Sequence, residues 1–110
     1  MSQLPETDAS ASRFVIRRSE VNGTRQIVVS GELDIAAAPE LRHAYSVPAG
    51  SGQQAVVLDL AGVTFIDSSG IHALVGAYEI YSERLRIVAS PEVARMIDLC
   101  GLNTFLPIEV

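Results

Sequence analysis

The sequence has one cysteine, Cys100, and contains no lysine. A single cysteine excludes a disulfide within the chain and is typical of a reducing compartment. No segment approaches the roughly 18 consecutive apolar residues of a transmembrane helix, and the first residues lack the basic and apolar regions of a signal peptide. These absences predict a cytoplasmic protein with no membrane partner.

Positive charge is also scarce. Eight arginines stand against 13 Asp and Glu residues, giving a net charge of −5, whereas nucleic acids are bound through clustered cations. We therefore expect no nucleic-acid partner. The two histidines, His43 and His72, give no recognisable zinc spacing with the cysteine, and no metal or cofactor is predicted. The one metal hypothesis left open is a hard-cation site, if Asp34, Asp59 and Asp67 meet at the ends of adjoining strands.

What the chain does contain is enough apolar material for one domain. Its 110 residues are 48 % hydrophobic and 19 % charged, a balance typical of a globular protein with its own core. Residues 1–12 are polar and predict a flexible tail. The domain is then expected over residues 13–110.

Local patterns predict an N-terminal hairpin followed by alternating helices and strands. The Asn-Gly pair at 22–23 suits a tight turn between antiparallel strands at 13–18 and 25–30. The apolar run 55–60 is typical of a central parallel strand covered by helices, and a short extended piece should follow it to Ile66. The other expected elements are helices at 36–46 (starting near Ala38), 69–82 and 91–100, a flexible link at 48–52, a strand at 85–89 and a short edge strand at 105–108.

This order predicts an α/β fold. Strands that alternate with helices imply parallel pairs joined by crossovers. We therefore expect a mixed sheet of four to five strands, with an antiparallel N-terminal hairpin and then parallel strands, packed with about three helices. The inward stripe expected for the helix at 69–82 consists of Ile71, Leu74, Val75, Tyr78 and Tyr81. The stripe expected for the last helix consists of Val93, Met96, Ile97 and Cys100.

The junction at residues 67–70 (Asp-Ser-Ser-Gly) is the candidate functional site. Small polar residues before an apolar helical repeat are typical of a helix N-terminus, where unpaired amides favour anions. Ser68 could be a helix cap, a nucleophile or a phosphorylation switch. His72 lies one turn on as a conceivable base, but the Gly-x-Ser-x-Gly nucleophile elbow is absent, so hydrolysis is disfavoured.

A phosphate on Ser68 would add about −1.5 to −2 charges beside Asp67, and beside Asp34 if its loop lies close. The helix N-terminus would favour the anion by roughly 0.3–1 kcal/mol, so the fold should survive. A partner covering the site would have to desolvate the charge. The pattern thus favours a switch that releases a partner.

Three segments in order resemble the STAS family, specifically the bacterial anti-sigma factor antagonists. They are residues 31–34 (Gly-Glu-Leu-Asp), residues 57–71 with the Asp-Ser-Ser-Gly motif, and residues 90–102. The resemblance covers nearly the whole chain from about Phe14. It implies a single STAS domain without enzymatic activity.

The resemblance also implies a mechanism and site residues. Such antagonists bind an anti-sigma factor that is a serine/threonine kinase, which releases the sigma factor to start transcription. The kinase phosphorylates the serine after the motif aspartate, here Ser68, and the antagonist dissociates until a PP2C-type phosphatase restores it. Ser69 matches the neighbouring hydroxyl and is the alternative acceptor. Asp34 matches the aspartate in the loop beside the phosphosite.

The implied partner surface lies around that loop and the starts of the helices at 36–46 and 69–82. His72 departs from the family pattern, in which a smaller residue is common. The alternative is a constitutive STAS adaptor in a signalling or lipid-transport complex, with Ser68 only a cap; an enzyme or nucleotide binder is less favoured. The residues implied in partner binding are Asp34, Ile35, Asp67, Ser68, Ser69, Gly70, Ile71 and His72.

Overall fold

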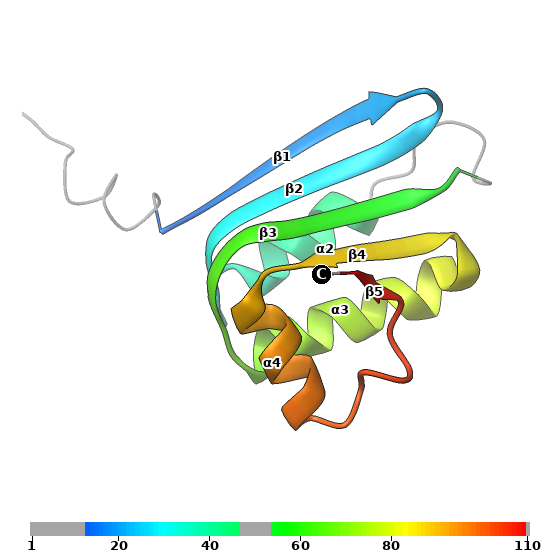
Figure 1. Cartoon of the computed structure of the whole chain (residues 1–110). Helices are drawn as coiled ribbons and strands as arrows, with labels where there is room; N and C mark the ends of the chain where they lie inside the picture. The colour runs from blue at the N-terminus through cyan, green and yellow to red at the C-terminus, as the bar shows by residue number, and fades with distance from the viewer. Residues whose placement is uncertain (1–12, 47–53, 110) are drawn as a thin grey trace, which may run out of the picture.

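The computed structural model describes residues 13–46 and 54–109 (Figure 1). The tail predicted at 1–12 and the link predicted at 48–52 lie outside these residues. The elements are β1 (Phe14–Val21), β2 (Thr24–Leu33), α2 (Ala38–Ser46), β3 (Val56–Ile66), α3 (Ser68–Tyr81), the 3-10 turn η1 (Ser82–Arg84), β4 (Leu85–Ala89), α4 (Pro91–Leu99) and β5 (Ile108–Glu109).

The strands form one sheet in the order β1-β2-β3-β4-β5. β1 and β2 pair antiparallel, and the three remaining pairs are parallel. Asn22 and Gly23 both have positive φ, 53° and 80°, the combination that a two-residue type I′ hairpin turn requires. The predicted mixed α/β sheet and its N-terminal hairpin are confirmed.

The core lies on the face of the sheet that α2 and α3 cover. These two helices pack beside each other and against the strands. Alternate side chains of β2, β3 and β4 are buried there, as the period of two in a strand requires. The strand residues in this layer are Ile27, Val29, Val56, Leu58, Leu60, Leu85, Ile87 and Ala89.

Helix α4 begins as its sequence predicts. Ser90 is the N-cap, its Oγ accepts from the amide of Val93 at 3.2 Å, and Pro91 occupies the first helical position. Val93 and Ile97 are buried, but Met96 is only half-buried and Cys100 is exposed. The prediction that Cys100 lies in the buried stripe is wrong, because the helix ends at Leu99 and the chain turns away there.

Two strand predictions also need correction. The extended piece predicted after residue 60 is not a separate segment but part of β3, which continues to Ile66 while its register with β2 shifts twice. The edge strand begins at Ile108 rather than at Phe105. Glu109 is held there by Arg86 of β4, whose Nε and Nη2 donate to the carboxylate at 2.7 and 2.9 Å. No helix in the described part of the chain is long and apolar enough to cross a bilayer.

Candidate functional site

Asp67, and not Ser68, caps the N-terminus of α3. The backbone of Asp67 is extended, and its Oδ1 accepts from the amides of Ser69 at 2.9 Å and Gly70 at 3.3 Å. Its carbonyl accepts from the amide of Ile71 at 3.0 Å. The hypothesis that Ser68 is the cap is therefore wrong. The amides that would favour an added anion already have an acidic partner within the chain.

Ser68 is the first residue of α3 and is exposed. Its hydroxyl makes no hydrogen bond within residues 13–46 and 54–109. Ser69 is half-buried, Gly70 and Ile71 are buried, and His72 is exposed. Within this first turn and a half of α3, only Ser68 and His72 are exposed.

Gly70 brings the end of β2 against the start of α3. A Cβ at this position would lie 2.6 Å from the carbonyl oxygen of Leu33 and 2.7 Å from Cγ1 of Ile66. The amide of Asp67 donates to the same Leu33 carbonyl at 3.4 Å. The loop that follows Leu33 therefore lies next to the Asp-Ser-Ser-Gly junction. The sequence alone did not predict this close contact between Leu33 and Gly70.

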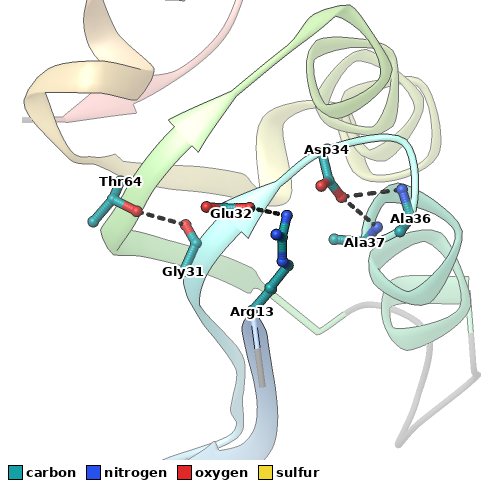
Figure 2. Close-up of polar contacts among 7 residues, drawn as sticks. All are labelled: Arg13, Gly31, Glu32, Asp34, Ala36, Ala37 and Thr64. Carbon is teal, nitrogen blue, oxygen red and sulfur yellow. Dashed lines mark hydrogen bonds and ion pairs between the residues drawn. The ribbon is translucent and has the colours of Figure 1, made fainter. Parts of the chain in front are cut away.

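That loop contains Asp34, whose side chain caps the turn that leads into α2. Figure 2 shows its Oδ1 accepting from the amides of Ala36 at 3.0 Å and Ala37 at 3.1 Å. The turn moves the start of α2 to Ala38, as predicted. Ile35, held between these hydrogen bonds, is 73 % exposed. The structure thus places a carboxylate and an exposed apolar side chain beside the start of α3.

Two further contacts fix the end of β2, and sequence reasoning missed both. Figure 2 shows Arg13 donating to the carboxylate of Glu32 at 3.2 Å, and Thr64 Oγ1 donating to the carbonyl of Gly31 at 3.4 Å. The ion pair is exposed, so it adds at most about 1 kcal/mol. These contacts tie β1 and β3 to the strand end that carries the Asp34 loop.

The hypothesis of a metal site at Asp34, Asp59 and Asp67 is wrong. In the parts of the chain that the structure describes, no group of three or more His, Cys, Asp or Glu side chains could hold a metal ion. Asp59 lies within the sheet, paired with Val28 and Val88, and its Oδ1 accepts from the amide of Ala61. It is not at the strand end where the other two aspartates lie.

Comparison with known proteins now identifies this arrangement. The STAS domain family model matches residues 15–110. The crystal structure of an anti-sigma factor antagonist from Mycobacterium paratuberculosis superposes with a TM-score of 0.76 at 30 % identity, covering 86 % of this chain and 84 % of that one. The chain is a STAS domain of the anti-sigma factor antagonist family.

More distant relatives agree with this assignment. The STAS domain is 27 % identical over 85 residues to the anti-sigma-B factor antagonist of Staphylococcus epidermidis, covering 74 % of this chain and 79 % of the relative. It is 29 % identical over 87 residues to that of Listeria monocytogenes, covering 76 % of each. The anti-sigma factor antagonist SpoIIAA in its unphosphorylated form shares the fold, with a TM-score of 0.63 at 19 % identity over 87 % of this chain and 89 % of that one.

The STAS domain also carries an open groove beside the junction. It has a volume of about 430 Å³ and lies between the end of β3 and α4. Phe65 and Leu99 are its exposed apolar side chains. The residues that line it are Thr64, Phe65, Ile66, Glu92, Arg95, Met96 and Leu99.

Proposed function

We propose that this STAS domain is a phosphorylation-switched antagonist acting in the bacterial cytoplasm. It binds an anti-sigma factor with serine/threonine kinase activity, so that a sigma factor is released to start transcription. Phosphorylation of Ser68 ends the binding, and a PP2C-type phosphatase restores it. The observation that supports the proposal is the exposed Ser68 hydroxyl, which does not cap the helix and lies beside the Asp67 carboxylate.

Exposure favours Ser68 over Ser69 as the acceptor. A kinase must bring the serine hydroxyl into its own active site, so an exposed side chain at the first helical position is the easier substrate. Ser69 is half-buried, and its amide donates to Asp67 within the cap. Ser69 is the alternative acceptor.

The cap determines how a phosphate on Ser68 would act. Because Asp67 already accepts from the amides of Ser69 and Gly70, the added charge gains little from the helix N-terminus and faces a carboxylate at the preceding residue. At such an exposed position the charge stays hydrated, so the fold is retained. A partner covering the site must remove that water.

The size of this effect is large enough for a switch. In the complex, one unpaired like charge about 4 Å from the phosphate makes the binding free energy less favourable by about 4 kcal/mol, at an effective dielectric constant of about 20. At about 1.4 kcal/mol for each factor of ten, affinity falls several hundredfold or more.

The partner surface would be built from the β2–α2 loop and the capped start of α3. Asp34 and Ile35 contribute from the β2–α2 loop, with Ile35 as an apolar contact. The start of α3 contributes Ser68 and His72 as its exposed side chains, supported from below by the buried Gly70 and Ile71. A partner lying over both loops would cover the Ser68 hydroxyl.

The first prediction concerns Ser68→Asp. We expect about a hundredfold weaker binding to the cognate kinase by calorimetry, from the charge argument above, with an unchanged far-UV circular dichroism spectrum. Ser68→Ala should bind like the wild type and resist phosphorylation. The matched control Ser69→Ala should still be phosphorylated, on a peptide containing residue 68. A Ser68→Asp protein that bound the kinase as tightly as the wild type would overturn the proposal.

A second experiment distinguishes the switch from a constitutive adaptor. The wild-type protein is incubated with ATP and the kinase that it binds, and the peptide covering residues 55–84 is then examined by mass spectrometry. The switch predicts one added phosphate on that peptide and loss of binding. Intact binding without phosphate identifies an adaptor.

A further inference from the structure

Ser68 and His72 lie one above the other on the exposed side of α3. Both are exposed, while Ala73 and Ala77 on the opposite side are buried. Residues four apart in a helix have Cβ atoms about 5–6 Å from each other, and helical side chains lean toward the N-terminus. We therefore expect the imidazole of His72 to be within reach of a group on the side chain of Ser68.

A phosphate on Ser68 would find few other donors. Anions at a helix start usually bind the first free amides, but Asp67 accepts from those of Ser69, Gly70 and Ile71 through its side chain and carbonyl. An imidazole can donate a hydrogen bond and carries positive charge when protonated, a change that occurs near neutral pH.

The charged groups on α2 and in the β2–α2 loop do not compete with His72 for a phosphate on Ser68. Asp34 lies in the β2–α2 loop and is repulsive. Arg42 of α2 and Glu79 of α3 both interact electrostatically with Tyr45. These two charged residues therefore lie further along the helices, away from Ser68.

Near the end of β2, Arg13 is paired with Glu32 at 3.2 Å. Several of the other charged groups line two grooves. Glu40 and His43 of α2 line a groove against β1 together with Arg18. On the α4 side, Glu92 and Arg95 line the groove beside Phe65 and Ile66. Because that groove adjoins the junction, Arg95 is the competing cation.

We propose that His72 binds the phosphate of phosphorylated Ser68 and keeps it dianionic at neutral pH. His72 is then a positioning residue that holds the charge over the outer face of α3, where the partner must lie. The inference rests on Ser68 being the site of modification, as proposed above. It needs no bond to be made or broken by His72.

The test uses phosphoserine placed at position 68 during synthesis by an expanded genetic code, so that no kinase is needed. The second ionisation of the phosphate is followed by ³¹P NMR as a function of pH. At low ionic strength we expect its midpoint to lie at least about half a pH unit lower in the wild-type phosphoprotein than in the His72→Gln phosphoprotein, because a unit charge about 6 Å away in water already gives a shift of that size and a direct contact gives more. The control His43→Gln, which alters the other histidine, should leave the midpoint unchanged.

Equal midpoints with and without His72 would overturn the inference, as would a midpoint that moved with Arg95→Gln but not with His72→Gln. His72 is exposed, so the variant should fold, and circular dichroism checks this. The proposed function is read separately from the same samples. Tight binding of the 68-phosphoprotein to the kinase would refute the switch, whatever the ³¹P midpoint.

Discussion

Gly70 is the residue at which the two halves of the site touch. A methyl group there would meet the backbone oxygen of Leu33 at 2.6 Å and Ile66 Cγ1 at 2.7 Å. A backbone oxygen within a sheet cannot move away as a flexible side chain can. The site therefore requires glycine because of a close approach, since the φ of Gly70 is not in the left-handed region.

Gly70→Ala should accordingly destabilise the domain by about 1–3 kcal/mol, the usual range for overpacking. Urea unfolding monitored by circular dichroism measures the change. Ser68→Ala, two residues earlier in the same turn but exposed, is the control and should stay within about 0.5 kcal/mol of the wild type. Equal stability of Gly70→Ala and the wild type would show that β2 and α3 can move apart at this point.

At the residue scale, the sequence predicted a cap correctly where only one side chain could serve. Ser90 precedes a proline and an acidic residue, and it is the cap of α4. The run at 67–69 offers three capping side chains in succession, so the pattern could not decide between Asp67 and Ser68. The position of the chain relative to Leu33 decides it, and that is a tertiary contact.

At the scale of elements, α2 and α3 are joined by Tyr45. Its hydroxyl donates to the carbonyl of Ala73 at 2.8 Å, and the hydroxyl of Tyr81 donates to the carbonyl of Tyr45. Gly76 leaves room for the Tyr45 ring, because a Cβ there would lie 2.6 Å from the Tyr45 hydroxyl oxygen and 3.8 Å from Cζ. These contacts fix how the C-terminal end of α2 lies against α3.

A double-mutant cycle tests this contact. Gly76→Ala gains up to about 1 kcal/mol of helix propensity, but the clash with the Tyr45 hydroxyl should make it net destabilising by about 1–2 kcal/mol. In the Tyr45→Phe background only the ordinary 3.8 Å contact remains, so the same substitution should become neutral or stabilising. Chemical denaturation of the four proteins gives the coupling energy. Additive effects would mean that the helices do not meet at this atom.

Element boundaries followed from the sequence where local chemistry decides them. β4 spans the residues predicted, and the hairpin turn lies at Asn22 and Gly23. The bounds of β5 did not follow from the sequence, because a two-residue edge strand exists only through its pairing with β4 and the Arg86–Glu109 contact. Cys100 was misplaced because a periodic pattern does not say at which turn a helix stops following the core.

At the scale of the whole molecule, stability should depend on pH through Tyr45. Burial raises the pKa of its phenol, while Arg42 opposes the shift. The native state therefore holds this proton more tightly than the unfolded chain, in which a tyrosine ionises near pH 10. The contribution is fully present below about pH 10 and is lost as the pH rises through the raised pKa.

We expect the free energy of unfolding to fall above about pH 10, and to fall less steeply in Tyr45→Phe. Urea unfolding of both proteins between pH 7 and 11 measures this. Below pH 9 the difference between the two should be constant, which serves as the internal control. Parallel curves at high pH would contradict the assignment to Tyr45.

The α/β class, the antiparallel hairpin and the parallel strands could be predicted because periodicity and the alternation of elements are local in the sequence. The strand order and the groove between β3 and α4 could not, since they depend on which strands meet. A binding partner likewise cannot be predicted from local patterns in the sequence. The bearing of Ser68, Asp34 and His72 on function stays a prediction that binding and phosphorylation experiments must test.

The strands lie across the sheet in the order in which the chain is synthesised. Every strand pairs with the one made just before it, so none must be threaded between two that are already paired. The entropy cost of closing each loop grows with its length, and topologies with nearer contacts fold faster. The arrangement that sets β2 beside β3, and so brings the Asp34 loop to the start of α3, is therefore also one that the chain can reach by adding strands one at a time from its N-terminal hairpin.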